Sequence, residues 1–270
     1  MKVDLLVVNY KTKNLLQRLL ETLNSDYQPN VWNLYVADNG SDDGSIEWIH
    51  EHAEEYRIDH VFQFPNIGYA RAINALSAAG TNELLCALNS DVWFSTNHVI
   101  QAIDSFKQNP NQAIMGPKQV DEASKIRHGG IFWDGNKMFP PIHRGWAQPD
   151  LDDSKFKDRI RCWTVSGSIY YIRRSVWNEM LSCPIFNEQI APNTIGSFLP
   201  TDLYFEETFL SVHAGYHGFE IWYDGTIETC GHSWSASVSP NDQKLREFFL
   251  KSSAFYRAAC DAHGINHELN

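Results

Sequence analysis

The stretch Leu84-Leu85-Cys86-Ala87-Leu88-Asn89-Ser90-Asp91 decides the fold that this sequence predicts, because an apolar run stops abruptly at a polar triplet. A short apolar run bounded in this way is typical of a buried strand. Ligand crevices of open α/β sheets lie at the carboxyl ends of the strands, and Asp91 follows such an end. A carboxylate there suits a hard divalent cation that also contacts phosphates. Alternatively, Asp91 only caps the next helix. Other motifs of the chain are needed to choose between a metal ligand and a helix cap.

Strand and helix patterns alternate through the first 117 residues. Apolar runs predict strands at residues 3–8, 32–37, 58–64, 83–88 and 113–116. Helical spacing of apolar residues predicts helices at residues 14–23, 46–56, 69–79 and 97–108. This alternation is typical of βαβ units and a mostly parallel sheet. Right-handed crossovers then bring the carboxyl ends of the strands to one edge. We therefore predict a Rossmann-like α/β fold with helices flanking the sheet.

The pattern changes after Pro117. Residues 122–150 are rich in Gly, Pro, His and aromatic residues and lack helical periodicity. Residues 160–172 predict β structure, and residues 183–200 predict a loop. Short strands are expected at residues 219–223 and 226–230, and helices at residues 174–180, 202–214 and 242–263.

The composition limits the classes of partner. A formal net charge of −11 argues against a protein held mainly by contacts to nucleic-acid phosphates. Nucleic acid nevertheless remains a possible partner, because the chain has a local basic stretch. Its residues are Lys155, Lys157, Arg159, Arg161, Arg173 and Arg174. Five cysteines without a CxxC pair indicate reduced thiols and a cytoplasmic protein. No apolar run reaches the roughly 18 residues of a membrane span, so we expect at most peripheral attachment to the inner face of a membrane.

Polar side chains follow each of the first four predicted strands. The four segments are Asn9-Tyr10-Lys11-Thr12, Asp38-Asn39-Gly40-Ser41, Pro65-Asn66-Ile67-Gly68 and Asn89-Ser90-Asp91, with Arg71 and Asn74 in the helix after the third. Their aromatic, carboxylate, amide and guanidinium groups suit a nucleobase, a ribose and a diphosphate. The chain has neither GxGxxG nor GxxxxGK[ST], the usual phosphate-binding loops. We therefore expect a metal to neutralise much of the phosphate charge.

Taken in order, these motifs resemble those of the family-2 inverting glycosyltransferases of the GT-A fold, and especially their rhamnosyltransferase-like branch. Residues 167–174 and the segments Phe205-Glu206-Glu207 and Gly231-His232-Ser233 extend the resemblance, which covers residues 3 to about 235. It implies transfer of a sugar from a UDP- or dTDP-sugar to an acceptor hydroxyl, as in polysaccharide biosynthesis, on a glycan or a lipid-linked saccharide. It also implies a nucleotide-sugar-binding half at residues 1–117, an acceptor-binding and catalytic half of the same domain at residues 118–240, and a C-terminal helix and tail at residues 241–270.

The resemblance assigns the donor site to residues at the strand ends. Asp38 would hydrogen-bond the pyrimidine base, with Tyr10 near the ring. Asn66, Arg71 and Asn74 would frame the ribose and the phosphates, and Asn9 and Asn89 would also belong to the nucleotide-binding site.

The same resemblance implies a site for Mg²⁺ or Mn²⁺. Asp91 would be the main ligand, because Asn89 replaces the first acidic residue of the family's DxD motif. His232 would lie near the metal and the diphosphate, or serve as a structural histidine in a turn.

An inverting displacement needs a base to take the acceptor's proton. The family's acidic pair corresponds to Glu206-Glu207, and we predict Glu207 as the base, with Glu206 and Asp202 as alternatives. Acidic residues also favour a helix N-terminus for electrostatic reasons alone. On the acceptor side, His128, Trp133 and Trp163 would line a groove, although core packing explains each of them equally well.

Three other functions remain open at this point. The same chemistry could act on a hydroxymethylated DNA base, as in phage-type glycosyltransferases, if the basic stretch formed an exposed channel. A nucleotidyltransferase would usually carry a Gly-rich loop with a basic residue, which residues 9–14 lack. A non-catalytic sugar-binding module would not need Asp91 together with an acidic pair.

Overall fold

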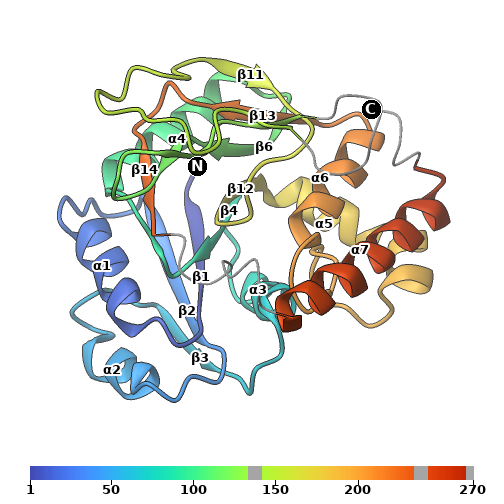
Figure 1. The fold of residues 1–270 in the computed structure, drawn as a ribbon. Helices are drawn as coiled ribbons and strands as arrows, with labels where there is room; N and C mark the ends of the chain where they lie inside the picture. Colours follow the sequence, from blue (N-terminus) through green and yellow to red (C-terminus); the bar gives the residue numbers. More distant parts are fainter. Residues whose placement is uncertain (133–141, 234–242, 266–270) are drawn as a thin grey trace.

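The central sheet of the computed structural model has eight strands, and the structure describes residues 1–132, 142–233 and 243–265 (Figure 1). The strand order is β11-β13-β6-β12-β4-β1-β2-β3. The strands are β1 (Val3–Asn9), β2 (Trp32–Asp38), β3 (His60–Gln63), β4 (Leu84–Asn89), β6 (Gln112–Pro117), β11 (Arg159–Arg161), β12 (Ile169–Arg173) and β13 (Glu220–Asp224). Strands from both halves of the sequence therefore share one sheet.

The sheet is mostly parallel, as the alternation of strands and helices predicts. β1 runs parallel to β2 and β4, β2 to β3, and β6 to β13. β12 lies antiparallel between β4 and β6, and β11 is antiparallel to β13. The register pairs Asn9 with Asp38, and Val8 with Asn89. This register brings the polar ends of β1, β2 and β4 side by side.

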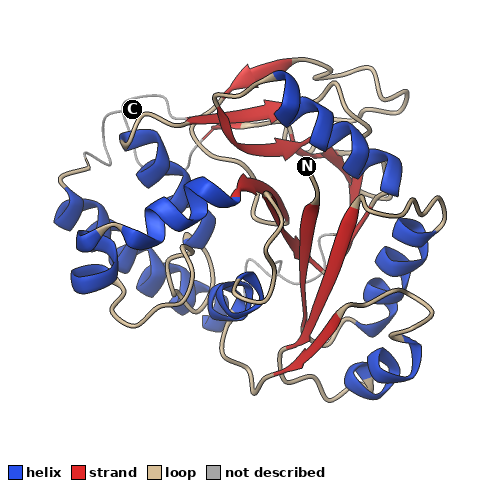
Figure 2. Cartoon of the chain, turned by 180° about the vertical axis from the view of Figure 1, so that it is seen from behind, coloured by secondary structure: helices blue, strands red, loops and turns tan. Residues whose placement is uncertain are grey.

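Helices cover both faces of the sheet because successive side chains of a buried strand point to opposite faces. In β1, Leu5 and Val7 pack with one group of helices, and Leu6 and Val8 with the other. The two groups lie on opposite sides of the sheet in Figure 2. The first group is α1 (Lys13–Asn24), α2 (Ser45–His52) and α4 (Thr96–Gln108), and the second includes α3 (Tyr69–Ser77), α5 (Arg174–Ser182) and α6 (Glu206–Tyr216).

A second, four-stranded sheet joins residues that are far apart in sequence. Its order is β5-β14-β7-β8. The strands are β5 (Val92–Trp93), β14 (Cys230–His232), β7 (Gln119–Val120) and β8 (Ile126–His128), and a separate pair is formed by β9 (Ile131–Phe132) and β10 (Ile142–His143). Gly231 faces Trp93, where a Cβ atom would lie 1.7 Å from the indole ring. Only glycine allows β14 to approach β5 this closely.

The C-terminal helix α7 (Gln243–His263) packs beside α6 and the short π-helix η1 (Ile185–Ile190). A third apolar cluster joins these elements, with Phe186, Phe209 and Tyr256 fully buried. Figure 1 shows α7 crossing this part of the molecule, on the same side as α3. Among the described residues, no helix combines the length and apolar character of a membrane span.

Three local predictions are wrong in detail. Residues 160–172, expected to be β structure, form two strands, β11 and β12, separated by a segment that includes the turn at Gly167. The helix expected from residue 202 begins at Glu206, because Tyr204 and Phe205 both have a φ of 70° and cannot continue a right-handed helix. η1 lies within the segment expected to be a loop.

Candidate functional site

A chain of hydrogen bonds connects the ends of three adjacent strands. Asn9 Nδ2 donates to Asp38 Oδ1 at 3.2 Å. Thr12 Oγ1 donates to Asn9 Oδ1 at 2.9 Å and lies 2.6 Å from Ser90 Oγ. Asp38, Asn9 and Ser90 are buried. The network holds the predicted base-binding carboxylate in a fixed relation to Asp91, the residue after Ser90.

The loops after β2 and β3 are held together by side-chain amides. Asn39 Nδ2 donates to Asn66 Oδ1 at 3.3 Å, and Asn39 Oδ1 accepts the backbone N–H of Ile67 at 3.1 Å. Gly40 has a φ of +86°, and a Cβ there would lie 2.8 Å from the backbone nitrogen of Asn66. Asp38 Oδ2 accepts the backbone N–H of Ser41 at 3.0 Å. These contacts fix the rim of the edge where the strands end.

The exposed part of this rim carries Tyr10, whose residue is 44% exposed. The Nζ of Lys11 lies 5.5 Å from the centre of the Tyr10 ring. Asn66 is also exposed, and Asn89 is partly buried. An accessible ring and amides at one edge can contact a flat, polar ligand.

Asn74 is placed differently from the other predicted donor-site residues. It is buried, and its Nδ2 donates to Phe198 O at 2.9 Å while its Oδ1 accepts the backbone N–H of Phe198 at 3.0 Å. Nδ2 also donates to Thr194 Oγ1 at 3.2 Å. Because its amide is used within the protein, the geometry favours a role in holding the 194–198 segment over direct contact with a ligand.

Asp91 and His232 meet where β4 ends and β14 runs past it. Asp91 Oδ1 and His232 Nε2 lie 3.5 Å apart, and both residues are buried. The backbone N–H of Ser233 donates to Asp91 O at 2.8 Å, which holds the two segments together. A carboxylate oxygen and an imidazole nitrogen at this separation fit a shared divalent cation, with room for ligands from phosphate and water.

His128 lies close to this pair on β8. Burial lowers its pKa to about 3, and the charges of His143 and His232 act in the same direction. Its ring is edge-on to Tyr223 at 5.7 Å, and its Nε2 has no hydrogen-bond partner among the described residues. His128 is therefore a neutral, buried imidazole near the Asp91–His232 pair.

Two carboxyl groups open helix α6. Glu206 is 6% exposed, and its Oε2 accepts a hydrogen bond from Thr201 Oγ1 at 3.2 Å. Glu207 is only partly buried and lies against Gly167, where a Cβ would come 3.0 Å from its Cδ. Burial raises the pKa of Glu206, with the charge of Glu207 as a further cause, and burial also raises the pKa of Glu207. Glu207 is thus the more accessible of two carboxyls that hold protons more tightly than usual.

Tyr69 lies beside the turn against which Glu207 packs. Its hydroxyl donates to Gly167 O at 3.0 Å. Burial raises the pKa of Tyr69 well above its ordinary value, and the charges of Glu206, Glu207 and Asp91 raise it further. Gly167 also lies against Glu207, and the next residue, Ser168, accepts the backbone N–H of Asn89 at 3.0 Å, so this turn lies between the candidate base and the strand end before Asp91.

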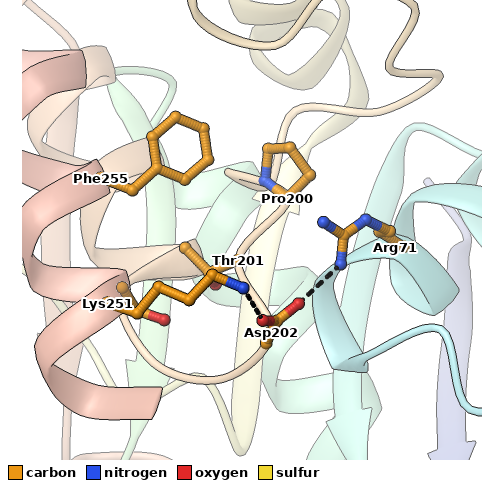
Figure 3. Close-up of a pocket in the computed structure, with 7 residues that line it drawn as sticks. Arg71, Pro200, Thr201, Asp202, Lys251 and Phe255 are labelled. Atoms are coloured by element: carbon orange, nitrogen blue, oxygen red, sulfur yellow. Dashed lines mark hydrogen bonds and ion pairs between the residues drawn. The ribbon is translucent and has the colours of Figure 1, made fainter. Parts of the chain in front are cut away.

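Asp202, the third candidate base, is held by two cations (Figure 3). Its Oδ1 lies 3.2 Å from Arg71 Nη1, and its Oδ2 lies 2.5 Å from Lys251 Nζ. The hydrogen bond from Lys251 and that from Arg71 lower its pKa. These residues line a pocket of about 220 Å³ together with Pro200. A carboxylate engaged in this way is a weaker base than Glu207.

Lys251 was not singled out from the sequence, because nothing distinguishes it from other lysines on an expected terminal helix. Among the predicted acceptor residues, Trp163 is partly buried against the third apolar cluster. Trp133 lies outside the described residues.

Comparisons with known proteins identify the family and the fold. The model of the family described as glycosyl transferase family 2 matches residues 4–179. No curated protein matches the chain.

Solved structures show the same fold at low sequence identity. The mannosyltransferase PcManGT from Pyrobaculum calidifontis, in complex with GDP-Man and Mn²⁺, has a TM-score of 0.61 at 14% identity, covering 95% of this chain and 63% of its own. GalNAc-T7 with UDP, GalNAc and Mn²⁺ has a TM-score of 0.65 at 13% identity, covering 96% and 50%. S. aureus TarS 1-349 in complex with UDP-GlcNAc has a TM-score of 0.57 at 16% identity, covering 94% and 66%. The chain therefore spans half to about two thirds of these proteins, and the GT-A fold is confirmed.

Proposed function

The chain belongs to glycosyl transferase family 2, and we propose that it transfers a sugar from a nucleotide-sugar to an acceptor hydroxyl with inversion at the anomeric carbon. One observation carries this proposal: the turn at Gly167-Ser168 lies against Glu207 and also accepts the backbone N–H of Asn89, two residues before Asp91, at 3.0 Å. Each of the two chemical tasks, charge neutralisation and proton removal, thus has a candidate residue in one region.

The donor in this proposal is a UDP- or dTDP-sugar. Asp38 lies at the end of β2 and would recognise the pyrimidine, with the exposed ring of Tyr10 beside the base. Asn9 holds Asp38 in place, and Asn66 lies on the adjoining loop. The neighbouring structures support a nucleotide-sugar donor, with UDP in GalNAc-T7, UDP-GlcNAc in TarS and GDP-Man in PcManGT.

Asp91 and His232 would hold Mg²⁺ or Mn²⁺, which supplies positive charge for the departing diphosphate. The donor set fits, since an oxygen and a nitrogen lie 3.5 Å apart in a buried position. Arg71 is close to the pocket beside α7 and would contact the phosphates after exchanging its ion pair with Asp202.

Glu207 would act as the base. The acceptor oxygen forms a bond to the anomeric carbon while the bond from that carbon to the diphosphate oxygen breaks, and Glu207 takes the acceptor's proton. A raised pKa suits this role, because a general base works best when its pKa lies near the pH at which the enzyme operates. Glu206 is buried behind it with a hydrogen bond from Thr201, which suits a supporting role.

The acceptor would be a glycan or a lipid-linked saccharide. Trp163, His128 and Trp133 remain proposed acceptor-side residues, and a rhamnosyltransferase-like preference remains part of the same proposal.

The structure disfavours the DNA alternative. Each of the six basic residues expected to form a channel contacts a partner in the chain itself, and four of them pair with carboxylates, which offset their charge. These contacts are Lys155 with Pro149 O, Lys157 with Asp153, Arg159 with Asp224, Arg161 with Glu220, Arg173 with Gln112 O and Arg174 with Asp4.

A thermal-shift screen tests the proposal directly. UDP, dTDP, GDP and ADP are each added with and without Mn²⁺, and a pyrimidine diphosphate with Mn²⁺ should raise the Tm most. Asp38→Ala should abolish this shift, whereas Asp104→Asn, on the exposed face of α4, should leave it unchanged. If no nucleoside diphosphate raises the Tm under any condition, the proposed function is wrong.

A further inference from the structure

Four side chains gather where α5, α6 and α7 meet, away from the strand ends. They are Cys183, directly after α5, His213, in the last turn of α6, His217, directly after α6, and His263, the last residue of α7. One ligand atom from each lies within 4.8 Å of all the others. One thiol and three imidazoles from three helices therefore converge on one point.

The distances are close to those of a tetrahedral zinc site. Zn–N and Zn–S bonds of about 2.0–2.3 Å place neighbouring ligand atoms roughly 3.3–3.8 Å apart. Cys183 Sγ and His263 Nε2 already lie 3.6 Å apart. The rings of His213 and His263 are 4.2 Å apart between centroids and inclined by 50°, so they are not stacked. Side-chain movements of roughly 1 Å would bring all four into coordination distance.

A second observation is independent of these distances. His213 is 1% exposed, and its Nε2 is buried without a hydrogen-bond partner among the described residues. Buried polar atoms are nearly always hydrogen-bonded, and a bound ion would explain why this nitrogen is an exception. Its neighbour across the cluster, Cys183, offers a sulfur, which is a good metal ligand and a weak hydrogen-bond acceptor.

The surroundings are those of a structural metal centre. Phe209 packs against both His213 and His263, at 5.5 and 6.3 Å between ring centres, and Phe186 packs against His213 at 5.9 Å. An apolar shell restricts solvent access to a metal. His217 is exposed and gives the cluster an opening to solvent.

We propose that Cys183, His213, His217 and His263 bind one structural Zn²⁺. A thiolate and three neutral imidazoles form a closed Cys-His₃ set with no position left for substrate. The Cys183 thiol gives up its proton to solvent on binding. This site is independent of the proposed cation site at Asp91, which offers oxygen and is part of the donor pocket.

The metal would connect the C-terminal helix to the catalytic one. α6 begins with Glu206 and Glu207, holds His213 near its end and is followed directly by His217. α7 carries the third imidazole and also Lys251, which pairs with Asp202. Zinc binding would therefore stabilise the arrangement of α6 and α7 beside the donor pocket.

Metal analysis of the full chain tests the proposal. The protein is stripped with a chelator, reloaded with Zn²⁺, passed through a desalting column and analysed by inductively coupled plasma mass spectrometry. We expect about one Zn²⁺ per wild-type chain, a higher Tm after reloading, and at least a tenfold weaker affinity in Cys183→Ser and His217→Ala, in line with the loss of one ligand. His217 is exposed, so His217→Ala should fold even if Cys183→Ser does not.

Matched variants separate this site from others. His50→Ala removes another exposed histidine, Cys162→Ser removes another partly exposed thiol, and Asp91→Ala disables the proposed catalytic site; all three should retain the Zn²⁺. With Co²⁺ in place of Zn²⁺, a thiolate-to-metal absorption band should appear in wild type and Cys162→Ser but not in Cys183→Ser. Wild type that retains no Zn²⁺ and shows no such band would overturn the proposal. So would Zn²⁺ retention that depends on Asp91 and not on His217.

Discussion

Asp91 Oδ1 and His232 Nε2 lie 3.5 Å apart, although one residue follows the end of β4 in the central sheet and the other lies in a short strand far along the chain. The pairing of β14 with β5 holds them there, because His232 is in register with Val92, next to Asp91. The carboxylate of Asp91 is therefore one of two side chains that together can bind a metal ion.

We expect Asp91→Asn to lower kcat/KM by at least about 100-fold, since a metal contributes several kcal/mol of charge stabilisation. His232→Ala should cause a smaller loss. The measurement is sugar transfer over a range of Mn²⁺ concentrations, where both variants need more metal. Asp104→Asn serves as the matched control. Wild-type metal dependence in Asp91→Asn would contradict the metal assignment.

Gly231→Ala should damage the same site indirectly. A Cβ at this position would lie 1.7 Å from the Trp93 ring, so β14 has to move away from β5. Overpacking of this kind costs roughly 1–3 kcal/mol of unfolding free energy, and we also expect weaker Mn²⁺ binding because His232 is displaced. Gly215→Ala in α6 is the control: its Cβ would meet Ile221 at an ordinary 3.5 Å, and alanine favours a helix by about 1 kcal/mol. Urea denaturation distinguishes the two variants.

Replacing the proposed base should affect chemistry rather than binding. We expect Glu207→Gln to reduce kcat by about 10²–10⁴-fold, the usual range for general base catalysis, with the affinity for the nucleoside diphosphate nearly unchanged. Single-turnover kinetics and calorimetric titration measure the two quantities separately. Asp202→Asn should cost less than about tenfold in kcat, because Asp202 already has two cationic partners. If Asp202→Asn lowers kcat as much as Glu207→Gln does, the assignment of Glu207 as the general base is wrong.

The raised pKa values of Glu206 and Glu207 predict the pH dependence. A base works only when it is deprotonated, and a raised pKa means that the proton is lost at a higher pH than for an ordinary carboxyl. Activity should therefore fall on acidification well before the pH at which a solvent-exposed glutamate is protonated. Glu206→Gln should leave this fall nearly in place, because burial rather than the charge of Glu206 raises the pKa of Glu207. A marked shift of the kcat/KM profile in Glu206→Gln would assign the titration to Glu206 instead of Glu207.

The ion pair between Lys251 and Asp202 joins α7 to the segment before α6. We expect Lys251→Met to lower the unfolding free energy by no more than about 1 kcal/mol, because Lys251 is 73% exposed at its side chain and exposed ion pairs contribute little. The larger effect should be on donor KM, since the variant leaves Arg71 as the main partner of Asp202. Lys107→Met breaks a comparable exposed pair away from the pocket and should leave KM unchanged.

Much of the site could be predicted from the sequence because its elements are local. An apolar run followed by Asn89-Ser90-Asp91 predicts a strand end, and the observed β4 ends at Asn89. The segments after β1 and β2 follow the same pattern and lie beside it through the sheet register. The start of α6 could not be located in this way, because the positive φ of Tyr204 and Phe205 depends on packing around them.

The sequence by itself determined the α/β alternation, the mostly parallel sheet and the chemical types of the strand-end residues, because hydrophobic periodicity and turn residues act over a few positions. Only the tertiary structure decided that Asn74 holds a buried loop, that Lys251 forms an ion pair with Asp202, and that Cys183 lies beside three histidines. Those relationships join segments that are distant in sequence. They depend on how helices pack across the sheet, and no local pattern encodes that packing.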